Sequence, residues 1–322
     1  MLKHTRREFV VSAAATSALL GLNSQLAFIP PANAQKANDA LAKGFHTFKN
    51  GSLEVTNISD GVWEKAHDPA FIKNASVDDT KAAIKAAGIT DAHVPIPFTV
   101  TVVKSGGKTI MFDAGTGAQL APTAGKLAAN MKAAGIDPKS IDTILVTHFH
   151  PDHIFGLMAK DTNEQTYPNA EIVLPKAEFA WWTDAGVFAK LPEARHGLAK
   201  RIQATLPAWK NVKLVEGEVE VAPGIRALPA FGHTPGHTAY VANGAQPFLV
   251  MADTANMPAL FVKNPGWHAV FDGDAALAES NRRKMFDRAI ADKAIVTGYH
   301  FGMPGAGTIQ KDGAGYAFVP VV

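Results

Sequence analysis

Cysteine is absent from all 322 residues of the chain. This absence excludes disulfide bonds, thiolate metal ligands and a cysteine nucleophile. A metal site in this protein therefore has to be built from histidine and carboxylate side chains, which suit zinc and also iron, manganese, cobalt or nickel. The lack of cysteine does not exclude an oxidising compartment.

A strong excess of charge of either sign is absent as well. Lysine and arginine number 31 against 29 aspartate and glutamate residues, which gives a formal net charge of +2. Residues 1–34 contain four of these charges, on Lys3, Arg6, Arg7 and Glu8. The rest of the chain then holds 28 basic (31 − 3) and 28 acidic (29 − 1) residues. A neutral protein gives no electrostatic reason to expect a nucleic-acid or anionic-membrane partner.

A hydrophobic run long enough to span a bilayer is also missing at the N-terminus. The apolar stretch 10–22 is too short and too interrupted for a transmembrane helix. It follows Arg6-Arg7 and precedes Ala32-Asn33-Ala34, whose small residues suit a signal peptidase. The pattern predicts a twin-arginine-type signal peptide over residues 1–34 and a periplasmic or secreted mature chain over 35–322, with no stable membrane anchor.

Strand and helix patterns interleave along the rest of the chain. The predicted strands are 53–58, 95–103, 109–112, 141–146, 170–174, 212–215, 217–221, 225–228, 238–241, 248–251 and 294–297. The predicted helices are 77–87, 123–134, 176–182 and 274–291. Residues 35–48 are interpreted as a loosely packed arm, and 294–297 as the last clear strand. This order predicts an α/β fold in which helices cover sheets within one domain.

Residues 147–153 carry three histidines and one aspartate directly after an apolar run. At strand spacing, His148 and His150 point to the same side. The proline that follows suits the first turn of a helix, so Asp152 and His153 emerge in a different direction. Ligands in two directions suit two adjacent metal ions better than one. The alternative interpretation is a chance cluster of surface histidines.

Three later positions offer further ligands. The loop 232–237 reads G-H-T-P-G-H, and its glycines permit a tight turn that fixes an imidazole, of either His233 or His237. Asp253 ends an apolar strand, where a carboxylate can place one oxygen on each of two metals. His300 follows the last predicted strand. A turn-capping aspartate and an ordinary loop histidine are the alternatives for Asp253 and His300.

These motifs resemble those of the metallo-β-lactamase-fold hydrolases. The likeness extends from about Leu53 to the C-terminus and includes Asp113 in the sequence F-D-A-G-T-G. Within the family, the chain is similar to the methyl parathion hydrolase-like and lactonase-like members through S-D-G at 59–61, the sequence 127–135 and F-V-P-V at 318–321. The resemblance implies an αββα sandwich of two mixed sheets covered by helices.

The resemblance also implies roles for the site residues. Two divalent metal ions are expected, zinc first, with manganese, cobalt or iron as alternatives. The implied ligands are His148, His150 and His233 for one ion, Asp152, His153 and His300 for the other, and Asp253 as a bridge. Asp152 and Asp253 are the implied catalytic residues. Asp113 and His237 are expected outside the ligand set, with Asp113 accepting the spare N–H of a ligand histidine.

Such a site predicts hydrolysis without a covalent intermediate. Two metals can share an activated water and bind the oxygen of the electrophile. Phosphotriesters, lactones and aryl esters are candidate substrates, and Asp152, Asp253 or Tyr299 can protonate the leaving group. The alternatives are an iron-dependent oxidoreductase of the same fold, similar to persulfide dioxygenases, a β-lactamase, a ribonuclease-like member and a metal-binding protein without catalysis. Relatives are often homodimers, so a homodimer is expected here.

Several apolar side chains near the motifs are candidates for the substrate pocket. They are Leu120, Trp181, Trp182, Phe261, Trp267 and Phe271. The stretch 261–271 follows the expected bridging aspartate, contains three aromatic residues and predicts a loop over the site that suits a small uncharged or apolar substrate. The alternative is that most of these aromatics pack in the core.

Overall fold

The computed structural model describes residues 39–321, which form two seven-stranded sheets. The first sheet follows chain order with strands β1 (Phe45–Asn50), β2 (Leu53–Lys65), β3 (Val94–Ser105), β4 (Lys108–Phe112), β5 (Thr143–Leu145), β6 (Glu171–Pro175) and β7 (Val212–Val215). The second has the order β14-β13-β12-β11-β10-β9-β8. Its strands are β8 (Glu220–Ala222), β9 (Ile225–Pro229), β10 (Thr238–Ala242), β11 (Phe248–Val250), β12 (Ile295–Thr297), β13 (Ala306–Asp312) and β14 (Gly315–Pro320). Both sheets contain parallel and antiparallel pairs, so both are mixed.

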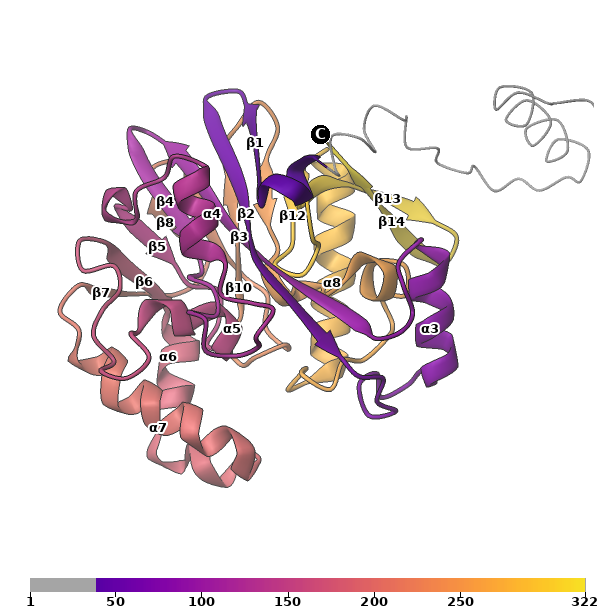
Figure 1. Cartoon of the computed structure of the whole chain (residues 1–322), viewed down its shortest axis with the longest axis horizontal. Coiled ribbons are helices and arrows are strands. Elements are labelled where there is room, and N and C mark those ends of the chain that lie inside the picture. Colours follow the sequence, from indigo (N-terminus) through magenta and orange to yellow (C-terminus); the bar gives the residue numbers. More distant parts are fainter. Residues whose placement is uncertain (1–38, 322) are drawn as a thin grey trace, which may run out of the picture. The chain divides into compact units, whose positions relative to one another are not determined.

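Helices connect and flank these strands (Figure 1). They are α3 (Val77–Ala86), α4 (Leu127–Ala133), α5 (Pro151–Ile154), α6 (Lys176–Thr183), α7 (His196–Thr205) and α8 (Ala275–Ala291). Among the described residues, no helix is both long enough and apolar enough to cross a membrane.

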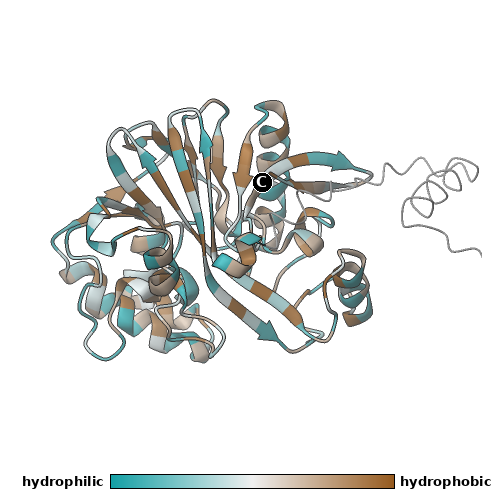
Figure 2. Cartoon of the chain, turned by 45° about the horizontal axis from the view of Figure 1, so that its top comes forward, coloured by the Kyte–Doolittle hydropathy of each residue, from teal (hydrophilic) through white to brown (hydrophobic). Residues whose placement is uncertain are grey.

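The two sheets pack face to face through apolar side chains from both. Phe112 and Val173 of the first sheet and Tyr240 and Phe248 of the second belong to one buried cluster. Full burial of such a side chain stabilises the fold by roughly 1.5–3 kcal/mol. Figure 2 shows hydrophobic residues interspersed with hydrophilic ones along the strands. The hydrophobic positions build the covered faces.

Helices cover the outer face of each sheet. Met131 of α4, Trp182 of α6 and Ile202 of α7 pack in the cluster on the first sheet. Phe286 and Ala289 of α8 pack in the cluster on the second sheet. The layers are therefore helix, sheet, sheet and helix, which confirms the αββα sandwich in one domain that the sequence led us to expect.

The structure corrects several predicted elements. Residues 45–50 form strand β1 on β2, so the predicted loose arm is wrong there. The helix predicted from residue 123 starts at Leu127, because the side chain of Asp60 accepts the backbone N–H of Leu127. Helix α7 was not predicted, and strands β13 and β14 follow the strand expected to be last.

Parallel pairing brings the site loops together. Strand β4 pairs in parallel with β5, and β11 pairs in parallel with β12. The carboxyl ends of parallel neighbours meet at the same edge of a sheet. The segments that follow these strands carry Asp113, the 147–153 motif, Asp253 and His300, so all four arrive at one edge of the sandwich.

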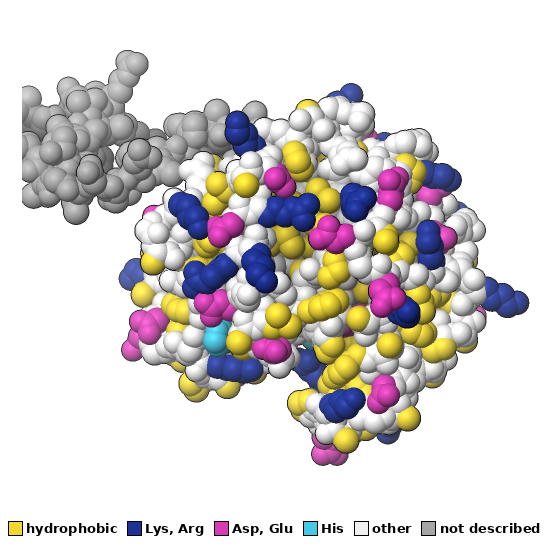
Figure 3. All heavy atoms as spheres, turned by 180° about the vertical axis from the view of Figure 1, so that it is seen from behind, with side chains coloured by type: hydrophobic (Ala, Val, Ile, Leu, Met, Phe, Trp, Pro, Cys, Tyr) yellow, Lys and Arg dark blue, Asp and Glu magenta, His cyan; other side chains and the backbone are white. Residues whose placement is uncertain are grey.

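The surface carries no region of one charge on the face seen in Figure 3, where basic and acidic side chains are interspersed. This distribution agrees with the neutral composition. The signal peptide predicted over residues 1–34 lies outside the described residues.

Candidate metal centre

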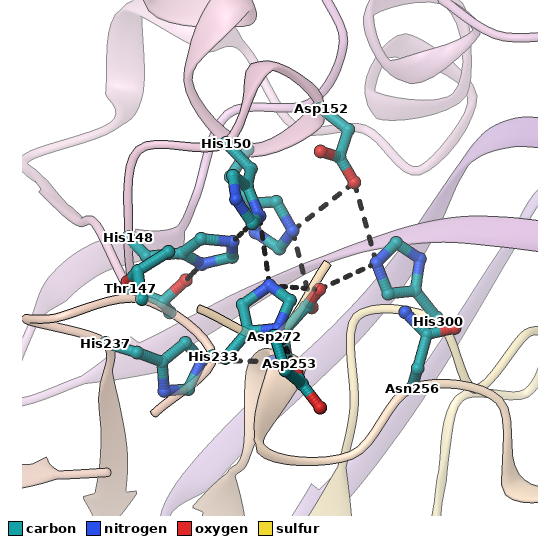
Figure 4. Close-up of polar contacts among 12 residues, drawn as sticks. Thr147, His148, His150, Asp152, His233, His237, Asp253, Asn256, Asp272 and His300 are labelled. Atoms are coloured by element: carbon teal, nitrogen blue, oxygen red, sulfur yellow. Dashed lines mark hydrogen bonds and ion pairs between the residues drawn. The ribbon is translucent and has the colours of Figure 1, made fainter. Parts of the chain in front are cut away.

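Seven side chains predicted from the sequence converge on one buried site. One group holds His148, His150, His233 and Asp253, and a second holds Asp152, His153 and His300. Within each group the candidate ligand atoms lie within 4.8 Å of one another. Figure 4 shows six of these side chains turned toward a common centre, namely His148, His150, Asp152, His233, Asp253 and His300.

The first group is built around His150. Its Nδ1 lies 2.9 Å from Nε2 of His148 and 2.9 Å from Nε2 of His233. Burial holds the pKa of His148 and of His150 well below the usual value. The two imidazoles are therefore neutral at pH 7 and offer a lone pair to a cation.

The second group faces the first across Asp253. Nε2 of His153 lies 3.4 Å from Oδ2 of Asp152, and Nε2 of His300 lies 3.5 Å from the same oxygen. Asp253 directs Oδ1 toward Nε2 of His153 at 3.4 Å and Oδ2 toward Nε2 of His300 at 3.1 Å. Oδ2 of Asp253 is also 3.3 Å from Nε2 of His233, so this carboxylate adjoins both groups.

Two buried atoms in this cluster have no hydrogen-bond partner, Nε2 of His153 and Oδ1 of Asp253. Leaving a buried polar atom unsatisfied costs about 1–3 kcal/mol. The two atoms lie 3.4 Å from each other, where the two groups meet. A set of imidazole nitrogens and carboxylate oxygens at this spacing fits divalent metal ions, which would satisfy both atoms.

Acceptors outside the cluster fix the orientation of three histidines. Nδ1 of His153 donates to Oδ2 of Asp113 at 2.7 Å, the contact expected from the sequence. Nδ1 of His233 donates to Oδ1 of Asp272 at 2.8 Å, and Nδ1 of His300 donates to the carbonyl of Pro97 at 2.8 Å. With the proton on Nδ1, each ring directs the lone pair of Nε2 into the site. Asp272 was not predicted from the sequence.

His237 lies outside the cluster and holds the backbone of Asp253 in place through a hydrogen bond. Its Nε2 accepts the backbone N–H of Asp253 at 3.1 Å, and its Nδ1 donates to the carbonyl of Ala230 at 3.1 Å. Burial lowers the pKa of His237 to about 3, so the ring is neutral at pH 7. Of the two histidines in the 232–237 loop, only His233 faces the candidate ligands.

Glu178 of α6 joins the two histidine loops and was missed by sequence reasoning. Its Oε1 accepts from the backbone N–H of Phe149 at 3.0 Å and from Nε1 of Trp182 at 2.8 Å. Its Oε2 accepts from Oγ1 of Thr234 at 2.7 Å and from the backbone N–H of Gly236 at 2.8 Å. The side chain is fully buried, so it holds both loops at a fixed spacing. The available signal in the sequence was that Glu178 is the one acidic residue in a helix that also carries three aromatic residues.

A cavity of about 400 Å³ opens onto the candidate ligands. Besides these ligands, its wall contains mainly apolar side chains, namely Trp63, Ile96, Phe98, Leu120, Ala121, Pro151, Ala194, Leu198 and Phe271, together with Arg195 and Asn256. Leu120 and Phe271 are the two predicted pocket residues that line it.

The other four predicted pocket residues do not line this cavity. Trp182 is buried and donates to Glu178, and Phe261 is buried in the core. Trp181 stacks edge-on against Trp182, and Trp267 lines a separate surface hollow near Lys263. These four aromatics pack in or against the core, with Trp182 and Phe261 buried and Trp181 and Trp267 partly buried, which is the alternative that the sequence left open.

Tyr299, a candidate acid for the leaving group, is occupied elsewhere. Its hydroxyl donates to the backbone carbonyl of Asp152 at 2.6 Å, and burial raises its pKa well above the usual value. The ring packs against His153 with centroids 3.8 Å apart. Tyr299 therefore supports the second group of candidate ligands and is absent from the cavity wall.

Comparison with known proteins identifies the family. The profile of the Metallo-beta-lactamase superfamily matches residues 96–296, more than half of the chain. An N-acyl homoserine lactonase from Bacillus sp is 29% identical over 168 residues, which are 52% of this chain and 58% of that protein. A ribonuclease Z from Agathobacter rectalis is 41% identical over 71 residues, 21% of this chain and 20% of that protein. The chain thus spans little more than half of that lactonase.

Solved structures show the same fold over most of the chain. AidC, a dizinc quorum-quenching lactonase in complex with a product, has a TM-score of 0.81 at 26% identity and covers 87% of this chain and 98% of its own. The hydrolase AbOPH has a TM-score of 0.80 at 23% identity and covers 87% of this chain and 98% of its own. The family match over more than half of the chain, together with the fold, shows that the chain belongs to the metallo-β-lactamase superfamily.

Proposed function

We propose that the protein is a dinuclear metal hydrolase that opens lactones, with N-acyl homoserine lactones as the leading substrate class. The position of Asp253 carries this proposal, because its Oδ2 lies between His233 of the first group and His300 of the second, and its Oδ1 faces His153 of the second. A carboxylate so placed can bridge two cations. The similarity to an N-acyl homoserine lactonase and to the dizinc lactonase AidC supports the substrate class.

For this reaction, the candidate ligands position the metal ions, and Asp152 carries a proton. Divalent metal ions at this site would supply a water activated near neutral pH and would stabilise charge on an ester oxygen. His148, His150 and His233 would hold one ion, and Asp152, His153 and His300 would hold the other. Asp152 is the carboxylate that lines the cavity with the more exposed side chain, 17% against 4% for Asp253. We assign it to pass a proton to the leaving alkoxide.

The cavity favours a small substrate with an apolar part. Its volume of about 400 Å³ lies in the range of small-molecule sites, and Trp63, Ile96, Phe98 and Leu120 give an apolar wall beside the candidate ligands. An acyl chain can be buried against this wall while an ester carbonyl reaches the metal positions. Zinc is the proposed metal because it is usually bound by the nitrogen of a neutral imidazole and the oxygen of a carboxylate.

The test combines elemental analysis with a substrate panel on protein purified without added metal. The panel holds N-hexanoyl homoserine lactone, phenyl acetate, a phosphotriester and a cephalosporin. We expect about two zinc, manganese or cobalt ions per chain, as in two-metal hydrolases, and the highest kcat/KM for the lactone. Asp253→Asn should lose metal and turnover together.

Other results would assign a different function. About one iron per chain without hydrolysis of any panel compound would overturn the proposal and favour the oxidoreductase alternative. Two metals with preference for the phosphotriester or the cephalosporin would keep the dinuclear hydrolase and replace the lactone as substrate.

A further inference from the structure

Arg195 brings a positive charge to the wall of the substrate cavity. It ends the short 3-10 helix Glu193–Arg195 that leads into α7, and it lines the cavity with Ala194 and Leu198. In the described part of the chain it is the one lysine or arginine on this wall, and it forms no ion pair with a carboxylate. The charge of Asp152 acts on this half-buried guanidinium, but no carboxylate of the described residues lies within ion-pair distance, so its N–H donors are available for a ligand.

Within the described residues, the one side-chain hydrogen bond of Arg195 involves a candidate metal ligand. Its Nη1 lies 3.2 Å from Nε2 of His150. The other ring nitrogen of His150, Nδ1, faces the cluster, 2.9 Å from Nε2 of His148 and of His233. His150 is therefore placed to hold a metal through Nδ1 and to present Nε2 to the cavity.

The hydrogen bond between Arg195 and His150 cannot persist when a metal is bound, because the proton of the imidazole then lies on Nε2. A neutral imidazole carries one N–H, so a ring that binds metal through Nδ1 has its proton on Nε2. Nε2 of His150 and Nη1 of Arg195 are then both donors and cannot bond to each other. An oxygen that accepts from both groups satisfies them at once.

We propose that Arg195 and Nε2 of His150 form a two-donor subsite that binds an acceptor oxygen of the substrate, the amide carbonyl next to the lactone ring. This inference rests on the proposed lactonase function and specifies which lactones the site selects. Apart from the candidate ligands, only Trp63 and Asn256 among the other wall residues carry a side-chain N–H, and the rest of the wall is apolar. A buried carbonyl without a donor binds poorly, so the subsite favours N-acylated lactones over alkyl lactones.

The experiment compares two lactones of similar size on the metal-loaded enzyme. N-hexanoyl homoserine lactone has the amide, and γ-decalactone lacks it. For Arg195→Met we expect the ratio of kcat/KM for the first over the second to fall about 10- to 100-fold, the range for a charge-assisted hydrogen bond. Arg195→Lys should recover part of the ratio, because an ammonium keeps the charge but not the planar geometry.

Two further variants isolate the effect. Lys200→Met removes one positive charge from an exposed position of α7 outside the cavity and should leave the ratio at the wild-type value. Asn256→Ala removes the one side-chain amide on the cavity wall. A selective loss with Asn256→Ala and none with Arg195→Met would overturn the inference, as would an equal loss for both lactones with Arg195→Met.

A binding measurement separates this inference from the proposed function. Calorimetric titration of metal-loaded protein with N-hexanoyl homoserine, the ring-opened compound, needs no turnover. If the wild type hydrolyses no lactone, the function proposal fails. The subsite is then supported by at least about tenfold weaker binding to Arg195→Met with unchanged metal content, and is overturned by equal binding or by no binding to the wild type.

Discussion

Single hydrogen bonds decide which nitrogen each histidine offers to the metal centre. His153, His233 and His300 each donate Nδ1–H to an acceptor outside the cluster. The acceptor sets both the tautomer and the ring angle, so these outer residues control metal affinity without contacting the metal. Asp113 has a further constraint, because its backbone adopts a φ of 60°. Aspartate and asparagine tolerate this conformation better than most residues.

Asp113→Asn should weaken metal binding while preserving the backbone. The amide oxygen can still accept from the backbone N–H of Thr147, but the amide NH₂ then faces Nδ1–H of His153 and no hydrogen bond forms. We expect metal affinity to fall about 10- to 100-fold, measured by competition with a chromophoric chelator.

The matched control for this variant is Asp142→Asn. Asp142 accepts from the backbone N–H of Thr109 and from Lys108, directly before β5 and away from the metal centre. Its substitution should leave metal affinity unchanged. Equal affinities for Asp113→Asn and the wild type would show that the hydrogen bond to His153 does not tune the site.

At the scale of elements, the centre is built by loops held at fixed distances from one another. Helix α6 places Glu178 between the loop that carries His148 and His150 and the loop that carries His233. Gly236 is needed at this junction, because a Cβ there would lie 2.0 Å from the backbone nitrogen of Glu178. The glycine that follows the proline of the G-H-T-P-G-H motif thus lets the loop approach the helix.

Gly236→Ala should force α6 and the 232–237 loop apart. The added methyl group meets backbone atoms, which cannot move aside as a flexible side chain would. We expect the free energy of unfolding to fall by about 1–3 kcal/mol or more, measured by urea denaturation, together with lower metal content.

Gly197→Ala provides the matched comparison. Gly197 lies in α7 and a Cβ there meets no atom within 4 Å, so alanine should be neutral or stabilise by up to about 1 kcal/mol. If Gly236→Ala were as stable as the wild type, the close contact with α6 would not matter for the fold.

At the scale of the whole molecule, we expect metal binding and folding to be linked. The ligands come from segments between residues 148 and 300, which meet only when both sheets have formed. A metal that binds only the folded chain stabilises it by about 2.7 kcal/mol per site at 100 times its dissociation constant. Without metal, the two unsatisfied buried atoms of His153 and Asp253 remain a cost to the folded state.

Chelation should therefore lower the thermal midpoint. Two sites at about 2.7 kcal/mol each give about 5 kcal/mol, so at about 2–4 °C per kcal/mol removing both metals should reduce Tm by roughly 10–20 °C, and added zinc should restore it. Asp253→Asn should show a much smaller shift. Identical melting curves with and without chelator, on protein shown to bind metal, would contradict this linkage.

Two expectations about the whole molecule stay predictions. The export signal over residues 1–34 is checked by cell fractionation, with Arg6→Lys and Arg7→Lys together as the variant expected to retain the protein in the cytoplasm. The homodimer is checked by light scattering on the purified protein.

The sequence by itself predicted an α/β fold and candidate ligands in short motifs, at 147–153, 232–237, Asp253 and His300. The αββα sandwich and the division of the seven ligands between two metals followed from the resemblance that these motifs carry. Strong apolar strands were also predictable, because period-two patterning follows from the pleat.

Only the tertiary structure decided which side chains line the cavity and which orient the ligands. Asp272 lies 39 residues from His233, Glu178 lies 58 residues from Gly236, and Arg195 lies 45 residues from His150. No local pattern specifies such pairs, because they arise from how helices settle on the sheets. The same reason sends Trp182 into the core while Trp63, on a long strand, reaches the pocket.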